Sequence, residues 1–304
     1  MATLKVTDGH KLHYTVKGNT HGLPVLYLHG GPGGGCSQAV QRFFDFRRNR
    51  VIFLDQRGAG KSRPFATTKN NTTDHLVEDI NRLLDHLGLE KVFLFGGSWG
   101  STLALVYAIR YPERVTGLLL RGIFLATHAE NNFYLRGGMK QFFPDVWNRF
   151  ISHVPTRHKT DPAIFYEKQM NSRVSEIRRA FAYEWAFYEY SIAKLCTTDK
   201  KTDAAIKGFP FEALSRLEAH YITRNCFLPD NYILENCSRI KHLPVSIVQG
   251  RYDMICPPSA AFELHSKLPK SVLRIETSGH SGGEKPIEAR LISEMKRMTK
   301  SAGY

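Results

Sequence analysis

The chain has few cysteines and no long apolar run, and these absences exclude several classes of protein. Its five cysteines are odd in number, lack regular spacing and form no Cys-x-x-Cys pair. This pattern argues against a disulfide framework and a structural zinc site, and it fits a reducing compartment. No apolar run reaches the roughly 18 residues of a membrane span, and residues 1–5 lack the apolar block of a secretory signal. We therefore expect a cytoplasmic protein that needs no metal.

Acidic residues are also scarce relative to basic ones. The chain has 28 Asp and Glu against 42 Lys and Arg, a net charge of +14. Such an excess raises nucleic acid as a candidate partner. However, the basic residues are spread along the 304 residues, the tight clusters are Arg47–Arg50 and Lys296-Arg297, and no nucleic-acid-binding motif is present. We therefore expect neither a nucleic-acid nor a membrane partner, and the charge itself has no explanation in the sequence.

Short apolar segments separated by helical patterns predict an α/β protein. The first two strands form a hairpin, and the later ones are the apolar runs of a buried sheet. The expected strands are residues 4–6, 12–16, 24–28, 51–54, 92–95, 117–120, 245–248 and 272–275.

Helices are expected between these strands. Residues 74–87 carry apolar side chains at helical spacing, with Thr73 as the expected N-cap and Gly88 directly after the helix. Residues 101–110 and 284–299 are expected to form two more helices. Strands that alternate with helices indicate a mostly parallel sheet with helices on both faces.

The character of the chain changes in its middle part. Between residues 126 and 235 strand-like runs give way to aromatic-rich helical segments, such as 172–195 and 211–224. The simplest organisation is a sheet core formed by residues 1–125 and 236–304, with residues 126–235 inserted as a helical cap.

The sharpest chemical signal is the segment Gly96–Gly100, which fits the pattern G-x-S-x-G. It follows the expected strand 92–95 and precedes a helix, which is the context of a nucleophile elbow. The turn is so tight that Gly96 and Gly100 must be small, and it raises the Ser98 hydroxyl above the edge of the sheet. Ser98 is therefore the candidate nucleophile.

A serine hydroxyl needs a base, normally a histidine that a carboxylate orients. After a nucleophile elbow the acid and then the histidine follow in chain order. Asp253 follows the strand 245–248, and His280 follows the strand 272–275. Taken singly, Asp253 would be a turn or capping residue and His280 an exposed loop histidine. Both follow the ends of parallel strands, where α/β sheets place their sites, and together they favour a triad with Ser98.

The tetrahedral intermediate of acyl transfer needs two hydrogen-bond donors. One is the backbone N–H of Trp99, directly after the candidate nucleophile. The other is expected in the glycine-rich loop 29–35, where we favour the N–H of Gly31 and keep Gly30 as the alternative. A nucleotide-binding interpretation of this loop fails, because it lacks the G-x-G-x-x-G spacing and Pro32 removes an N–H donor.

Several motifs together resemble the proline iminopeptidase family, the prolyl aminopeptidases among the α/β-hydrolase serine peptidases. The similarity extends from about residue 4 to the last helix. It rests on the segments HGGPG (29–33), DQRGAGKS (55–62), GGSWGSTLAL (96–105), LRGIF (120–124), GRYD (250–253) and GHS (279–281). The resemblance implies an α/β-hydrolase fold with Ser98, Asp253 and His280 as the triad, and release of N-terminal proline from peptides.

The resemblance also assigns residues to substrate binding. The family carries a Trp-x-x-Trp-Glu type motif whose glutamate binds the free amino terminus, and residues 185–189 match it, with Tyr188 in place of the second Trp and Tyr190 in place of a following Gly. This match implies Glu189 as an amine-binding residue, and a second match implies Glu218. Two desolvated carboxylates suit a protonated secondary amine, which offers two N–H donors. Residues implied as walls of the slot for the pyrrolidine ring are Phe124, Tyr134, Ile255 and Cys256.

The expected function is thus a serine aminopeptidase that cleaves short peptides through a prolyl-enzyme, without metal or cofactor. Another α/β-hydrolase activity, either a carboxylesterase or an aminopeptidase of broader specificity, is the alternative that the triad alone leaves open. A non-catalytic binding protein is disfavoured by the complete set of Ser, Asp and His.

Overall fold

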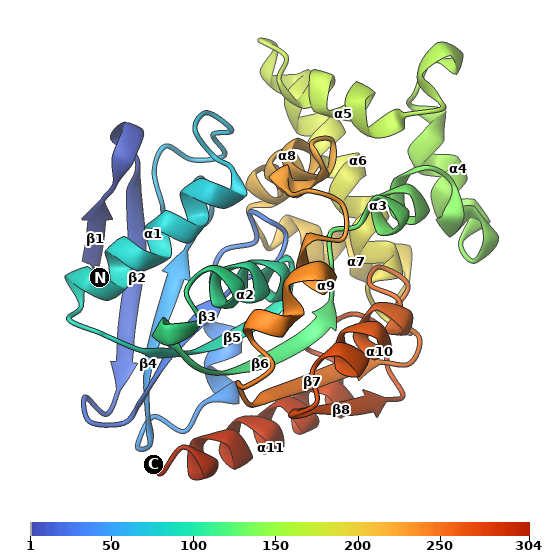
Figure 1. The fold of residues 1–304 in the computed structure, drawn as a ribbon. Coiled ribbons are helices and arrows are strands. Elements are labelled where there is room, and N and C mark those ends of the chain that lie inside the picture. Colours follow the sequence, from blue (N-terminus) through green and yellow to red (C-terminus); the bar gives the residue numbers. More distant parts are fainter. Residues whose placement is uncertain (1) are drawn as a thin grey trace.

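The computed structural model describes residues 2–304, and its centre is an eight-stranded sheet (Figure 1). Across the sheet the strands follow the order β1-β2-β4-β3-β5-β6-β7-β8. β1 and β2 pair antiparallel with their neighbours, and β3 to β8 run parallel. The strands are β1 (Ala2–Lys5), β2 (Lys11–Gly18), β3 (Leu23–Leu28), β4 (Asn49–Asp55), β5 (Val92–Ser98), β6 (Val115–Ile123), β7 (Val245–Gly250) and β8 (Ser271–Glu276).

Helices cover both faces of the sheet, because the parallel strands are apolar on both sides. One face packs against α1 (Thr73–His86), α2 (Trp99–Arg110), α9 (Tyr232–Asn236) and α10 (Pro258–Lys267). The other face packs against α11 (Lys285–Ser301). α2 is apolar on all sides and buried along almost its whole length, so it anchors the residues at its N-terminus firmly.

The chain between β6 and β7 is helical up to α9, and most of it has a core of its own. Its aromatic side chains stack closely; for example, the rings of Phe150 and Tyr166 are parallel, with centroids 4.3 Å apart. In Figure 1 these helices lie together beside the sheet, away from β1 and both termini. They are α3 (His128–Leu135), α4 (Pro144–Ser152), α5 (Pro162–Met170), α6 (Ser175–Ile192), α7 (Asp199–Lys207) and α8 (Phe211–Ile222). We propose residues 126–235 as a cap domain on this basis, with its last part, which includes most of α9, packed on the sheet.

Two details of the expected elements differ from the structure. The N-cap of α1 is Thr72, whose side chain accepts a hydrogen bond from the His75 amide, so the expectation for Thr73 was wrong. Thr73 lies inside the helix, where its hydroxyl donates to the carbonyl oxygen of Cys226. α2 begins at Trp99 rather than at residue 101, because the turn at Ser98 leads straight into the helix. Within residues 2–304 no helix has both the length and the apolar character to cross a membrane.

Candidate active site

Ser98 lies at the end of β5, where the chain turns directly into α2. Its backbone has φ 57° and ψ −129°, a strained conformation for a residue with a side chain. The turn is closed on both sides: a Cβ atom at Gly96 would lie 2.1 Å from the Gly100 carbonyl oxygen, and one at Gly100 would lie 2.1 Å from the Leu28 carbonyl oxygen. The two glycines therefore allow the turn that presents the Ser98 side chain.

Asp253 and His280 meet beyond the ends of β7 and β8. Asp253 Oδ2 lies 2.8 Å from His280 Nδ1, and the carboxylate is 1% exposed. Its Oδ1 accepts hydrogen bonds from the amides of Ile255 (3.1 Å) and Cys256 (2.8 Å). Gln249 Nε2 donates to Oδ2 from 3.1 Å. Three donors besides the histidine thus hold a buried carboxylate in a fixed orientation, as an orienting acid requires.

Arg121, at the carboxyl end of β6, contacts the opposite side of the His280 ring. Its Nη1 lies 3.1 Å from His280 Nε2 and donates to the His280 carbonyl oxygen from 2.8 Å. A guanidinium can only donate, so Nε2 is the accepting nitrogen and Nδ1 carries the proton that faces Asp253. This is the tautomer of a general base. Ser98 itself makes no hydrogen bond to His280 within the described residues 2–304.

The strand end 121–123 brings Ser98 and His280 into one neighbourhood. Ser98 is the register partner of Ile123 in the β5–β6 pair. A Cβ atom at Gly122 would lie 3.0 Å from His280 Cε1 and 3.3 Å from Asp253 Oδ2. The His280 imidazole and the Asp253 carboxylate therefore pack directly on Gly122. This glycine precedes Ile123, the register partner of Ser98.

The two candidate oxyanion donors flank Ser98. Trp99 is the first residue of α2, and Gly31 lines the same cavity as Ser98; a Cβ atom at the alternative, Gly30, would lie 3.3 Å from Ser98 Cβ. Within residues 2–304 neither backbone N–H donates to another protein group, so both stay available to a ligand. Gln56 links the two segments: its Nε2 donates to the His29 carbonyl oxygen (2.9 Å), and its Oε1 accepts from Trp99 Nε1 (2.9 Å).

Two glutamates from the helical segment form a pair, of which Glu218 is buried and Glu189 is partly buried. Glu189 of α6 and Glu218 of α8 lie against each other, and Trp185 Nε1 donates to Glu218 Oε2 from 2.7 Å. Burial, followed by the charge of Glu189, raises the pKa of Glu218 well above its ordinary value. Burial also raises the pKa of Glu189, while Glu218, His280 and Arg121 act in the opposite sense. The pair thus retains a proton on Glu218 at a pH where an ordinary carboxyl has lost it.

A narrow cavity is lined by Ser98 and by Glu218 of this pair. Its apolar walls come from α3, α8 and the segments after β6 and β7, and Glu218 lines it as well. Seven of the residues expected from the sequence line this cavity: Gly31, Ser98, Phe124, Tyr134, Glu218, Ile255 and Cys256. Asp253, His280, Trp99 and Glu189 do not line it. Asp253, His280 and Trp99 belong to the same site through the contacts given above. Glu189 is connected to the cavity through Glu218.

The sequence analysis missed several residues that the structure brings to the site. Glu130 and Asn131 line the cavity, and Arg121, Gln249 and Gln56 contact the candidate residues His280, Asp253 and Trp99, respectively. Glu130 had a sequence signal, because Thr127-x-x-Glu130 has the pattern of a capping box, and the structure forms that box at the start of α3. Gln56 and Arg121 lie in the segments 55–62 and 120–124 that carry the resemblance, but no local pattern assigns a role to them, to Asn131 or to Gln249.

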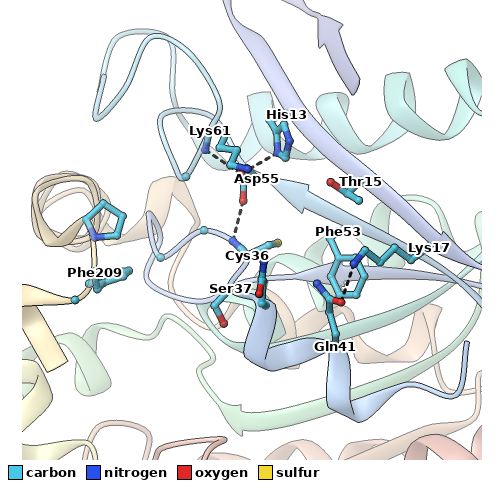
Figure 2. Close-up of a pocket in the computed structure, with 16 residues that line it drawn as sticks. His13, Thr15, Lys17, Cys36, Ser37, Gln41, Phe53, Asp55, Lys61 and Phe209 are labelled. Atoms are coloured by element: carbon cyan, nitrogen blue, oxygen red, sulfur yellow. Dashed lines mark hydrogen bonds and ion pairs between the residues drawn. The ribbon is translucent and has the colours of Figure 1, made fainter. Parts of the chain in front are cut away.

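A larger cavity lies between β2, the glycine-rich loop and the segment before α8 (Figure 2). Asp55 is at its centre and accepts hydrogen bonds from the amides of Cys36 (2.7 Å) and Lys61 (2.9 Å) and contacts His13 Nδ1 at 3.1 Å. Asp55 therefore fastens the glycine-rich loop to β4, and the candidate catalytic residues lie outside this cavity. In the part of the chain that the structure describes, no three His, Cys, Asp or Glu side chains gather as metal ligands.

Comparison with known proteins agrees with this architecture. A family model described as alpha/beta hydrolase fold matches residues 24–285, and the chain belongs to this fold family. Solved structures with similar folds include an esterase from Exiguobacterium antarcticum (TM-score 0.66, 22% identity, 98% of each chain). A meta-cleavage product hydrolase mutant, CumD A129V, is also similar (TM-score 0.62, 20% identity, 98% of each chain). At these identities the likeness shows the fold alone, and it confirms the expected α/β-hydrolase class.

More similar sequences define the family within that fold. A probable proline iminopeptidase of Leptolyngbya boryana is 41% identical over 297 residues, which cover 97% of this chain and 92% of the relative. Proline iminopeptidases of Arabidopsis thaliana (41% identity, 97% of this chain, 78% of the relative) and Neisseria gonorrhoeae (37%, 95% and 93%) are also similar. The chain belongs to the proline iminopeptidase family, as the sequence motifs indicated.

Proposed function

We propose that this protein is a serine prolyl aminopeptidase, which releases proline from the amino terminus of short peptides. The observation that carries the proposal is the pair Glu189–Glu218, placed at a cavity that the Ser98 hydroxyl also lines. An esterase has no use for two desolvated carboxylates beside its acyl site. Membership of the proline iminopeptidase family supports the same activity.

Amine recognition follows from the charge of the pair. With one proton held between Glu189 and Glu218, the pair carries one negative charge and attracts one protonated amine. A prolyl ammonium has two N–H donors, so each glutamate can receive one of them. Peptides with a blocked amino terminus lack this charge, and we expect them to be poor substrates.

The ring of the bound residue would occupy the apolar part of the cavity. Phe124, Ile222 and Ile255 offer apolar surface there, and Tyr134 adds an aromatic ring. With the amine at the glutamates and the carbonyl carbon at Ser98, only a short first residue fits between the two anchors. The helices of the proposed cap close the cavity on the side away from the sheet, which favours short peptides over folded proteins.

Acylation would begin when Ser98 Oγ attacks the carbonyl carbon of the first residue. His280 Nε2 accepts the hydroxyl proton, so the Ser98 hydroxyl must replace Arg121 Nη1 at this atom. The carbonyl π electrons move to the oxygen, which receives hydrogen bonds from the N–H groups of Gly31 and Trp99. Asp253 stabilises the imidazolium at Nδ1. His280 then gives the proton to the leaving nitrogen as the C–N bond breaks, and the prolyl ester of Ser98 remains.

Deacylation would use the same groups in the reverse roles. His280 Nε2 takes a proton from water, whose oxygen attacks the ester carbonyl. The second tetrahedral intermediate collapses with return of the proton to Ser98 Oγ, which releases free proline and the original serine. All proton transfers thus pass through one imidazole.

The test compares two substrates and three variants. A prolyl arylamide and a simple aryl ester are offered to the wild type, Ser98→Ala, Glu189→Gln and, as a matched control, Glu184→Gln. Glu184 lies on the same helix α6, where it pairs with Arg149 outside the cavity. We expect Ser98→Ala to abolish both activities, Glu189→Gln to lower kcat/KM for the arylamide about 100-fold or more and for the ester little, and Glu184→Gln to change neither.

Two outcomes would contradict the proposal. Equal loss of ester and arylamide turnover in Glu189→Gln would assign Glu189 to the fold rather than to the amine. Hydrolysis of the ester together with no hydrolysis of any aminoacyl arylamide by the wild type would establish the alternative, a carboxylesterase.

A further inference from the structure

Two basic segments that are far apart in the sequence meet on one surface of the fold. Residues 42–50 and 285–304 carry nine basic against three acidic side chains, so these 29 of the 304 residues supply six of the fourteen net positive charges. The segments are joined where Asn49, at the start of β4, donates from Nδ2 to Thr299 Oγ1 of α11 at 3.0 Å, across 250 positions. The fold therefore concentrates a charge that the sequence distributes.

A cavity lies between these two segments. Its volume is about 320 Å³, within the range of about 300–1,000 Å³ that small-molecule sites occupy. The buried part of its wall is apolar and consists of Phe43, Phe44 and Met295. Ile292 of α11 adds an apolar side chain that is 39% exposed. The exposed cationic side chains of the wall are Arg42, Arg47, Arg48 and Lys296.

Each of the three acidic side chains in the two segments already has an arginine partner. The pairs are Asp45–Arg47 (3.0 Å), Glu288–Arg42 (3.0 Å) and Glu294–Arg297 (2.7 Å). Among residues 2–304 neither Arg48 nor Lys296 forms a salt bridge with an acidic side chain. Arg48 Nη1 donates to the backbone oxygen of Tyr304 at 3.2 Å, and a guanidinium has five N–H donors in all. Two positive charges at the cavity thus lack an acidic side chain.

The number and kind of these charges indicate which anion fits. A phosphate monoester carries about 1.5 to 2 negative charges at pH 7 and has three acceptor oxygens. It can therefore match both free charges, because a guanidinium fork pairs with two phosphate oxygens and an ammonium supplies a compact third contact. A carboxylate or a phosphodiester of nucleic acid carries one negative charge and would leave one cation unmatched.

We propose that the cavity between residues 42–49 and α11 is a binding site for a phosphate monoester with a small apolar group. The phosphate contacts Arg48 and Lys296, and the apolar group lies on Ile292. Free phosphorylated metabolites and lipids with a terminal phosphate both present this chemistry, and the experiment below distinguishes the two sources.

The site is remote from the candidate catalytic residues, so the inference does not depend on the proposed peptidase activity. β4 and β5 both run parallel to β3. Asn49 is the first residue of β4 and Ser98 the last of β5, so the cavity and the nucleophile lie at opposite edges of the sheet. In Figure 1 the last turn of α11 and the cap helices lie at opposite sides of the molecule. A ligand bound here leaves the Ser98 cavity open.

The test is a calorimetric titration with phenyl phosphate at physiological salt. Benzenesulfonate, which has the same ring but a single negative charge, is the control ligand. The proteins are the wild type, Arg48→Gln, Lys296→Gln and, as the matched control, Lys300→Gln. Lys300 is exposed one turn further along α11 and does not line the cavity. Thermal melts confirm that each variant is folded.

We expect the wild type to bind one phenyl phosphate, and to bind benzenesulfonate at least about tenfold more weakly. Arg48→Gln and Lys296→Gln should each weaken phenyl phosphate about tenfold, and Lys300→Gln less than about twofold, because salt screens a charge outside the cavity. Turnover of a prolyl arylamide should be the same with and without saturating phenyl phosphate. The absence of saturable binding would overturn the site, as would equal affinity in all three variants.

Vesicle sedimentation identifies the source of the phosphate. The vesicles are phosphatidylcholine alone and a four-to-one mixture of phosphatidylcholine and phosphatidic acid. Binding to the mixture that Lys296→Gln abolishes and Lys300→Gln retains supports a lipid headgroup, whereas binding of phenyl phosphate without retention on vesicles supports a free ester. A single-stranded RNA that binds in the same variant-dependent way while phenyl phosphate does not bind would replace the proposal with a nucleic-acid surface.

Discussion

Arg121 Nη1 lies 3.1 Å from His280 Nε2, the nitrogen that has to accept the proton of Ser98. The same guanidinium nitrogen also donates to the His280 carbonyl oxygen from 2.8 Å. The Arg121 side chain thus fixes both the ring and the backbone of the candidate base. No acidic side chain among residues 2–304 forms a salt bridge with Arg121. Arg121 is a positioning residue in this arrangement, because it acts through the histidine.

We predict that Arg121→Met lowers kcat for prolyl arylamide and for aryl ester by a similar factor, about 10- to 100-fold. The physical reason is that a displaced imidazole impairs every reaction that uses it, and a misplacement of about 1 Å costs on the order of 100-fold. Arg121→Lys keeps a donor at the strand end and should recover part of the loss. Steady-state kinetics with both substrates measure this effect, and a loss confined to KM would contradict it.

A second prediction concerns the pH dependence of stability through Glu218. Burial and Glu189 raise its pKa above the ordinary value of 4.5, so the folded protein holds a proton that the unfolded chain releases. The folded state is therefore favoured below pH 4.5 and loses this advantage as the pH rises toward the raised pKa. Glu218→Gln removes the titrating group. We expect the variant to gain stability relative to wild type between pH 5 and pH 8, by about 1.4 kcal/mol for each unit of pKa shift.

Urea unfolding of both proteins at pH 5 and pH 8 measures this difference. The same variant should keep part of its activity on prolyl arylamide, because Glu189 still carries the single negative charge of the pair. A stability difference that is the same at both pH values would show that the pKa of Glu218 is not raised in the folded protein.

A third prediction concerns Glu284, which connects the helical segment to the loop of His280. Its Oε1 accepts from the Leu195 amide, just after α6, and its Oε2 accepts from the Gly279 amide, each at 3.0 Å. We expect Glu284→Ala to lower kcat about tenfold, since the histidine loop loses a charged anchor. The matched control is Glu288→Ala, one turn into α11, where the carboxylate pairs with Arg42 at the surface. Loss of kcat in both variants alike would reject a specific role for Glu284.

A fourth prediction concerns the stability of the core rather than the site. Asp79 of α1 and Arg57 form a bidentate pair at 2.6 and 2.8 Å, with both side chains almost fully buried. Asp79→Ala would remove the closer partner of a buried guanidinium and leave it with Asp8 at 3.6 Å, and we expect the free energy of unfolding to fall by about 3 kcal/mol. Asp74→Ala on the same helix breaks an ion pair with Arg110 in which the Asp side chain is 69% exposed, and it should cost less than about 1 kcal/mol. Denaturant titrations of the two variants measure the contrast, and similar losses would contradict it.

Local sequence predicted the parts of the site that depend on local geometry. The elbow at Ser98 needs small residues at fixed spacing, and Asp253 and His280 follow strands whose parallel arrangement brings their ends to one edge. Arg121 gave no such signal, because it meets His280 across 159 positions and only through the order of the strands in the sheet. The expected N-cap at Thr73 was wrong by one residue: Thr72 caps the helix, and Thr73 instead donates to the Cys226 carbonyl oxygen, a contact across the chain that no local pattern predicts.

Helix α8 carries Glu218 and, one turn earlier, presses on the glycine-rich loop. A Cβ atom at Gly31 would lie 2.9 Å from Leu214 Cδ1, and one at Gly33 would lie 2.4 Å from the Ala213 carbonyl oxygen. Any redesign that tilts this helix to admit a bulkier first residue would therefore also push the loop that carries the proposed oxyanion donor Gly31. A movement of α8 would therefore change both the substrate selectivity and the rate of the proposed reaction. A larger first residue is better accommodated by smaller side chains in the cavity wall than by a shift of the helix.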